Sequence, residues 1–277
     1  MKIYTTKLVF LLFALIPMAI TAQEKLKGNK IVVSEDRVVD AFTKIDVNNK
    51  IDVVITQGTE QTVTVEGDEN LLMAVLTEVR NGVLTVSVTK KILRKKVLKV
   101  HITIDHALDE ITTNERAYVS SFGALALANI TINAEGDSKV TLDLKDCSEF
   151  FLNNNASANV NLTVQTETAY INANNTGKSK INLTTNTAEV LTQGSSTTEI
   201  SGTAAEMQLN AENKSNFKGE HFEIGTIKVY GSDAADIHIN ALESLVISAI
   251  NTAEVYIYNN PAITIEHFAD KAVLRKR

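Results

Sequence analysis

The sequence predicts an all-β protein: a β-solenoid resembling a parallel β-helix, with rungs of about 19 residues, preceded by a more irregular β-rich N-terminal part. One series of apolar residues recurs every 18–20 residues: Ile132, Leu152, Ile171, Leu191, Leu209, Val229, Ile247 and Ile265. A second series follows a similar period: Val140, Val160, Ile181, Ile200, Phe217, Ile237 and Val255. The composition agrees, because tryptophan is absent, only two prolines occur and aromatic residues make up 5%.

Residues 1–22 are predicted to be a secretory signal peptide. Lys2 and Lys7 precede an apolar run at 8–16, and the small residue Ala22 precedes the expected cleavage point. This run is shorter than the roughly 20 residues that a membrane-spanning helix needs, although an uncleaved anchor is the alternative. No cysteine lies near the cleavage point, and no later segment is apolar enough to span a bilayer. We therefore expect an exported protein located in the periplasm, on the outer surface or outside the cell.

The next segments lead into the repeats. Residues 23–40 form a polar lead with a candidate strand at 31–33. Residues 41–115 form the N-terminal β-rich part of the solenoid, where alternation predicts strands at 42–47, 51–55, 62–65, 83–88 and 97–104. A short capped helical turn is expected over 68–76. A cluster of basic residues follows: Lys90, Lys91, Arg94, Lys95, Lys96 and Lys99. We interpret it as the solvated flank of a hairpin, with a contact for anionic lipid or polysaccharide as the alternative.

Residues 116–277 form the repeat solenoid, continuous with the preceding part. Alternate side chains of each strand point inward and stack as a core, so the residues between them form outward columns. The first predicted outward column is Thr141, Asn161, Asn182, Ser201, Lys218, His238 and Tyr256. The second is Asp143, Thr163, Thr184, Thr203, Glu220, Asn240 and Tyr258. Asn133, Asn153 and Asn172 are predicted to form left-handed corners and to bond from rung to rung.

Charge and cysteine content limit the possible partners. The net charge is −6, and loss of Lys2 and Lys7 with the signal peptide makes it −8, which argues against nucleic-acid binding. Cys147 is the only cysteine, so the chain cannot form an internal disulfide. We expect Cys147 to be a buried thiol, with a reactive thiol as the alternative.

The sequence shows no recognisable catalytic or metal-binding motif. The five histidines have no metal-ligand spacing, and no phosphate-binding glycine loop or nucleophile motif occurs. We therefore predict no cofactor, no metal site and no catalytic residues. The alternative is a β-helix carbohydrate-active enzyme that acts on acidic polysaccharide, with Glu220 beside Lys218 and with His238 one rung further on.

The N-terminal segment carries a family resemblance. The positions are Phe42-x-x-Ile45-x-Val47, Ile51-Asp52-Val53-x-Ile55-x-x-Gly58, Val63-x-Val65, Asp68-x-Asn70-Leu71 and Gly82-x-Leu84-x-Val86. They resemble the opening of the GIN-domain family of auto-transporter head adhesins. The resemblance covers roughly residues 40–265, and it implies an exported protein of Bacteroidetes-type bacteria without established enzymatic residues. The Ser-Gly turns of that family are replaced here, for example by Asn155-Ala156-Ser157-Ala158.

We accordingly expect an exported, non-enzymatic β-solenoid that acts as an adhesin or binds a surface glycan or another envelope protein. The predicted binding residues lie on the outer face of the C-terminal rungs: Lys218, Glu220, His238, Asn240, Tyr256 and Tyr258. These rungs carry long, charged and aromatic side chains where earlier rungs carry Thr, Ser and Asn, and tyrosine is an efficient contact residue. Two alternatives remain: the tyrosines could shield the terminal rung, or the Thr and Asn columns could form a flat docking or water-ordering face.

Overall fold

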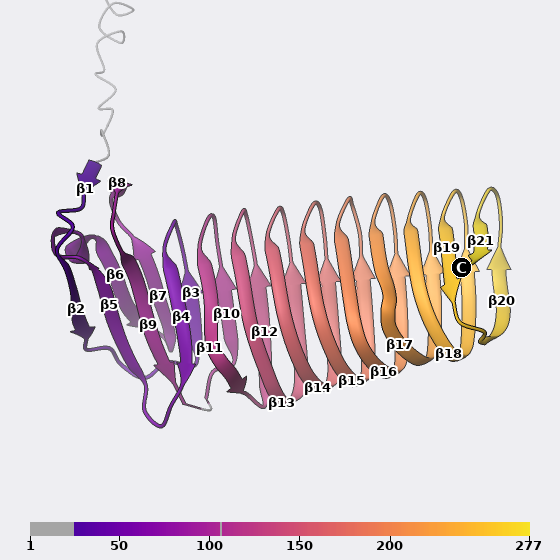
Figure 1. Cartoon of the computed structure of the whole chain (residues 1–277), viewed down its shortest axis with the longest axis horizontal. Coiled ribbons are helices and arrows are strands. Elements are labelled where there is room, and N and C mark those ends of the chain that lie inside the picture. Colours follow the sequence, from indigo (N-terminus) through magenta and orange to yellow (C-terminus); the bar gives the residue numbers. More distant parts are fainter. Residues whose placement is uncertain (1–24, 106) are drawn as a thin grey trace, which may run out of the picture.

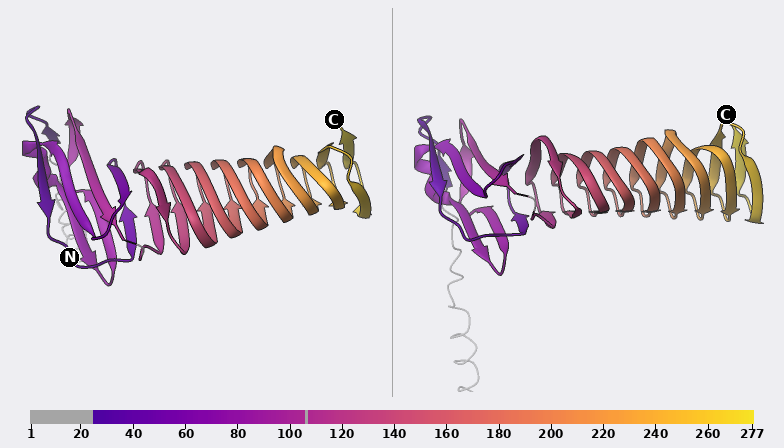
Figure 2. Two further views of the ribbon diagram at one scale, coloured as in Figure 1. Left: turned by 60° about the horizontal axis from the view of Figure 1, so that its bottom comes forward. Right: turned by 90° about the horizontal axis from the view of Figure 1, so that it is seen from below.

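The predicted fold class is confirmed. The computed structural model describes residues 25–105 and 107–277, so the predicted signal peptide lies outside the described residues. The chain forms a rod of about nine solenoid turns, with a broader, irregular β part at its N-terminal end (Figures 1 and 2).

The N-terminal part combines antiparallel and parallel pairing. Antiparallel pairs join β2 to β5, β5 to β9 and β6 to β7, whereas β3–β7 and β4–β9 are parallel. The β3 and β4 strands also pair in parallel with β10 and β11, which continues the sheet into the solenoid. The elements are β1 (Lys25–Lys27), β2 (Val32–Arg37), β3 (Lys44–Val47), β4 (Asp52–Gln57), β5 (Thr62–Asp68), the 3-10 helix η2 (Glu69–Ala74), β6 (Val75–Arg80), β7 (Val83–Val88), β8 (Lys91–Arg94) and β9 (Leu98–Ile104).

Every strand pair of the solenoid is parallel. The strands are β10 (Glu110–Thr113), β11 (Tyr118–Ala126), β12 (Asn129–Ala134), β13 (Lys139–Asn154), β14 (Asn159–Ala173), β15 (Lys178–Thr192), β16 (Thr197–Ala211), β17 (Asn216–Gly231), β18 (Asp236–Ala249), β19 (Glu254–Tyr258), β20 (Ala262–Phe268) and β21 (Val273–Lys276). From β13 to β18 one long strand bends through both sides of a rung. The inward residues form one continuous apolar core along the rod.

The exact register differs from the predicted one in three places. Val190, not Leu191, aligns with Ile171 and Leu209. The partner of Val160 is Ser179, and the partner of Phe217 is Thr198. The latter two shifts are of two residues, so the inward and outward faces are preserved although the neighbours change. The first outward column is therefore Thr141, Asn161, Lys180, Glu199, Lys218, His238, Tyr256 and Arg275.

The left-handed corners lie a few residues after the predicted asparagines. The corner column has φ between 55° and 70° and comprises Glu115, Gly136, Ala156, Asn175, Gly194, Asn213, Asp233, Asn251 and Asp270. Corner side chains bond the neighbouring turn: Asn213 Oδ1 accepts from the Gly194 amide at 3.1 Å, and Asp233 Oδ2 accepts from the Asn213 amide at 3.2 Å. These bonds satisfy backbone donors that a tight turn leaves unpaired.

The predicted asparagine ladder is present, but it lies on the strands rather than at the corners. Asn153 Nδ2 donates to Asn133 Oδ1 at 2.9 Å, and Asn172 Nδ2 donates to Asn153 Oδ1 at 3.1 Å. Leu191 pairs with Asn172 in the next rung and ends the ladder.

The C-terminal end of the rod has no covering element in the described part of the chain. The outermost strands are β20 and β21, on the two sides of the rod, and every residue of β20 is exposed. Ile263 and Ile265 are 47% and 54% exposed.

Asp68 organises the N-terminal part. The short helical turn predicted after it is confirmed as η2, yet the Asp68 side chain does not cap it. Its carboxylate instead accepts hydrogen bonds from the backbone amides of Lys30, Lys96 and Val97 at 3.1–3.2 Å. Burial by itself raises the pKa of Asp68, but these donors outweigh it, so the pKa lies below the ordinary value. A Cβ on Gly28 would lie 1.8 Å from the Asp68 Oδ2 atom, so any other residue there would displace the Asp68 carboxylate.

We expect Leu162→Asp to lower the free energy of unfolding by about 3–5 kcal/mol, because it places an unpaired carboxylate in the core. Leu162 is 3% exposed and points inward. The matched control is Asn161→Asp, which points outward beside Lys180 and should be nearly neutral. The measurement is urea unfolding, and equal destabilisation by the two variants would contradict the face assignment.

We expect Asp68→Asn to lower the urea midpoint at pH 7. Because the folded-state pKa is depressed, the stabilisation by the carboxylate is present above the unfolded pKa of about 4 and is lost as the pH falls through the folded value. The difference between wild type and variant should therefore shrink below about pH 4. Urea titrations from pH 2.5 to 8 measure it, and a difference independent of pH would be the contrary result.

Candidate functional site

The structure brings most of the predicted site residues together. Lys218 on β17, His238 on β18 and Tyr256 on β19 are direct neighbours in the parallel register. Asn240 and Tyr258 form an adjacent pair two residues along the same strands. All five side chains are half-buried, as expected for outward residues packed between rungs.

Tyr256 lies within a stack that runs along the rod. The His238 ring stacks on it with centroids 4.5 Å apart and planes at 16°. The guanidinium groups of Arg277 and Arg275, from the rung beyond β19, lie over the ring at 4.8 Å and 5.8 Å. The tyrosines are therefore not in the terminal rung, since β19 is covered by β21. The faces of the Tyr256 ring are occupied within the protein, which leaves its edge for other contacts.

Carboxylates hold the two rings in place. His238 Nε2 lies 3.2 Å from Asp236 Oδ1, and His238 Nδ1 lies 3.1 Å from the Tyr258 hydroxyl. The Tyr256 hydroxyl donates to Glu254, and this bond, together with burial, raises the pKa of Tyr256 above its ordinary value. His238 Nδ1 thus has a hydrogen-bond partner in the cluster, and Nε2 lies within ion-pair distance of Asp236.

Glu220 enters the cluster through its backbone. Asn240 Nδ2 donates to the Glu220 carbonyl oxygen at 3.2 Å, and Asn259 Nδ2 donates to Asn240 Oδ1 at 2.9 Å. A bulge between Gly219 and Glu223 takes Glu220 out of the regular register with β18. The Glu220 carboxylate and His238 therefore do not form an acid–base pair through a hydrogen bond in the described structure.

The described residues contain neither a metal-binding cluster nor a membrane-spanning helix. Within residues 25–105 and 107–277, no group of three or more His, Cys, Asp or Glu side chains is arranged to hold a metal ion. The same residues contain no helix with the length and apolar character needed to cross a membrane.

One protein-family model matches most of the chain. The model described as "Putative auto-transporter adhesin, head GIN domain" matches residues 41–182 and 148–261, well over half of the chain. The chain belongs to this family. The resemblance in the N-terminal motifs is thereby confirmed. No curated protein matches the chain.

Three solved structures share the fold. A protein named putative lipid binding protein from Parabacteroides distasonis is 16% identical, with a TM-score of 0.67 over 92% of this chain and 100% of that one. A putative adhesin from Parabacteroides merdae is 17% identical, with a TM-score of 0.67 over 92% and 99%. A putative adhesin from Parabacteroides distasonis is 17% identical, with a TM-score of 0.67 over 91% and 100%. Because the sequences are only 16–17% identical, the similarity to these structures concerns the fold alone.

The predicted site of this GIN-domain protein continues into a lysine-lined hollow of about 450 Å³ that the sequence interpretation missed. Its ionisable lining residues are Lys139, Lys178, Lys180, Glu199 and Lys218. Lys180 Nζ bonds Glu199 Oε1 at 2.7 Å, and this bond lowers the pKa of Glu199. Lys180 was overlooked because the predicted register placed Ile181 opposite Val160. Placing Ser179 opposite Val160 puts Lys180 in the same column as Lys218.

A second aromatic stack lies on the other strand segment of the rungs. Phe151 and Tyr170 are register partners whose ring centroids are 4.7 Å apart with planes at 7°. They line a hollow of about 340 Å³ together with Glu189 and Gln208. The spacing of 19 residues between the two rings was the available sequence signal.

Cys147 is buried, with 4% of its surface exposed. Burial, and then the neighbouring Asp146 carboxylate, raise the pKa of its thiol to about 11. Its register partner is Thr166, whose hydroxyl donates to backbone carbonyls of the same bend. The geometry favours the buried, unreactive thiol over the reactive one.

We expect the native protein to react with the thiol reagent DTNB at pH 8 on the order of 100-fold more slowly than the urea-unfolded protein, because a thiol with a pKa near 11 is almost fully protonated at that pH. Absorbance at 412 nm follows the reaction, with Cys147→Ser as the blank. Equal rates for native and unfolded protein would refute the burial of a protonated thiol.

Proposed function

We propose that this chain is an exported, non-enzymatic adhesin module that binds an acidic surface glycan along the outer face of its C-terminal rungs. The observation that carries the proposal is that a basic hollow and an aromatic stack adjoin each other on the first outward column. The lysine-lined hollow around Lys180 and Lys218 leads directly into the stack of His238 and Tyr256. The family's description as an adhesin head supports a binding role.

The chemistry of the face favours an anionic ligand. Both faces of the Tyr256 ring are occupied, by His238 and by the arginines, so a neutral sugar cannot stack on it. The hollow beside it has four ammonium groups and one carboxylate, Glu199, which is bonded to Lys180. The excess ammonium groups are donors for carboxylate, sulfate or phosphate groups. Rungs repeat about every 4.8 Å, so the column offers an extended row of contacts for a chain molecule. An acidic segment of another envelope protein would meet the same donors.

A β-helix enzyme acting on acidic polysaccharide is the competing function. It would need an acid and a base placed on the same substrate bond. His238 instead contacts Tyr258 and Asp236, and Glu220 enters the cluster through its backbone carbonyl. Incubation with acidic polysaccharides, followed by assay of reducing ends and unsaturated products, tests this function. Turnover abolished by Glu220→Gln or His238→Gln would overturn the non-enzymatic proposal.

We expect Lys180→Gln/Lys218→Gln to weaken binding to acidic glycans at least 10-fold, since two ammonium donors are removed from the centre of the face. The matched control is Lys214→Gln/Lys271→Gln, which removes the same charge from exposed corner residues. A glycan array identifies ligands, and titration of the best one gives affinities. Equal loss in both double variants would indicate general charge attraction and would contradict this site.

We expect Tyr256→Ala/Tyr258→Ala to weaken the same binding and also to lower the unfolding temperature, because both residues contact His238. Phe151→Ala/Tyr170→Ala removes a comparable stacked pair outside the proposed face and should leave binding unchanged. If the tyrosine variant loses stability while its binding is intact, the tyrosines are structural and drop out of the site.

A further inference from the structure

The opposite end of the rod carries a strongly basic surface. Residues 79–104 contain seven Lys and Arg residues and no Asp or Glu, in a chain with a net charge of −6; the seven are Arg80, Lys90, Lys91, Arg94, Lys95, Lys96 and Lys99. The β1 strand adds to this surface, because it pairs with β8 in a separate two-stranded sheet that aligns Lys25 with Lys91 and Lys27 with Arg94. Positive charge is therefore concentrated at the N-terminal end.

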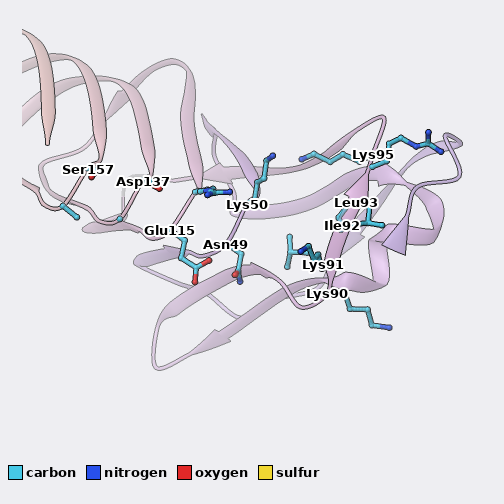
Figure 3. A pocket seen from close by; sticks show the side chains of 15 residues that line it. Asn49, Lys50, Lys90, Lys91, Ile92, Leu93, Lys95, Glu115, Asp137 and Ser157 are labelled. Atoms are coloured by element: carbon cyan, nitrogen blue, oxygen red, sulfur yellow. The ribbon is translucent and has the colours of Figure 1, made fainter. Parts of the chain in front are cut away.

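This basic sheet borders a hollow of about 860 Å³, which we call the basic groove. Strand β8 and its flanks form one side, and the corners of the first rungs form the other, at Asn49, Glu115 and Asp137 (Figure 3). The cationic residues of its lining are Lys50, Lys90, Lys91, Arg94, Lys95 and Arg116. The volume lies in the range typical of small-molecule sites.

Most of this charge is not neutralised inside the protein. Lys95 lies 3.7 Å from the Asp52 carboxylate. By contrast, Lys50, Lys91, Arg94 and Arg116 form no ion pair with any residue of 25–105 and 107–277. The six cationic side chains of the lining outnumber its two carboxylates, Glu115 and Asp137, and this excess of positive charge favours an external anion.

The basic groove also has an apolar component. Val88, Ile92 and Leu93 belong to its lining, and the Leu93 side chain is 49% exposed. No aromatic residue lines it. An acidic polysaccharide would use the cations but would gain little from exposed aliphatic groups, whereas a lipid presents an anionic headgroup joined to hydrocarbon. The lining therefore fits an anionic amphiphile better than a sugar chain.

We propose that the basic groove binds the phosphate headgroup of an anionic lipid, with Lys50, Lys91 and Arg94 contacting the phosphate and Leu93 contacting the adjoining hydrocarbon. The rest of the chain is acidic and is repelled by an anionic surface, so attraction at this end orients the rod. The last rung lies at the far end (Figure 1), so a lipid-bound molecule presents its C-terminal rungs away from the bilayer.

The first test is co-sedimentation with vesicles of phosphatidylcholine containing 30% phosphatidylglycerol, compared with phosphatidylcholine alone. We expect binding to the anionic vesicles only, and a loss on the order of 100-fold for Lys50→Gln/Arg94→Gln/Lys91→Gln, since each basic side chain near such a surface contributes roughly a factor of five. The charge-matched control Lys145→Gln/Lys214→Gln/Lys271→Gln should bind like wild type. Thermal unfolding verifies that both variants are folded. No binding to anionic vesicles, or equal loss in the control, would overturn the proposal.

A second variant distinguishes a lipid from other anions. Leu93→Ser keeps every charge and should weaken vesicle binding several-fold, because it removes only the apolar contact. If Leu93→Ser has no effect and millimolar glycerol 1-phosphate displaces the protein completely, the groove is a site for free phosphate groups. If polygalacturonate binds and vesicles do not, the ligand is an acidic polysaccharide. Either result would overturn the lipid assignment, and neither bears on the C-terminal face.

Discussion

Parallel pairing of successive rungs is the constraint on which the rest of the structure depends. Each rung buries its apolar residues only because the next rung covers them, and the single cysteine rules out stabilisation by an internal disulfide. This pairing requires a turn of fixed shape once per rung, and the column of left-handed residues from Glu115 to Asp270 supplies it. Corner amide and carboxylate groups then bond the neighbouring turn, so that the corners and the core repeat with the same period.

The sequence predicts the faces of the strands better than their neighbours. Alternation predicts which residues point inward in most rungs, although the adjacent apolar pair Val190 and Leu191 was assigned to the wrong faces, and the predicted solenoid with its irregular N-terminal part is confirmed. The register between rungs is harder to predict, because an inward column can be recognised from apolar residues only if every rung has an apolar residue at that position. Ser179 and Thr198 are buried polar residues in the column of Val160 and Phe217. They lie where the strand leaves the polar corner, and Ser179 accepts a hydrogen bond there from the buried Asn154. Matching apolar residues from rung to rung therefore predicts a register that is wrong by two residues at these positions.

The same register error explains what was missed in the candidate site. Lys218, His238 and Tyr256 lie in rungs whose register was predicted correctly, so their proximity could be predicted. Lys180 lies in a rung whose predicted register was wrong by two residues, so its place beside these residues could not. The occupation of both Tyr256 faces could not be predicted, since it depends on Arg275 and Arg277 in a rung beyond the recognised repeats. The N-terminal basic cluster was visible as a charge run, but the corners that complete its hollow come from distant segments.

The bulges in the rungs have a consequence for how such a chain can diverge. Register shifts occur between Leu144 and Cys147, between Glu199 and Ser201, and between Gly219 and Glu223, yet the core is continuous across all of them. Gaining or losing two residues within a strand leaves every remaining side chain on its original face, whereas a change of one residue inverts the face unless a bulge absorbs it. Each of the three shifts involves an odd number of residues, so bulges let rungs lengthen or shorten by single residues while the interior persists and the outer columns are reshuffled.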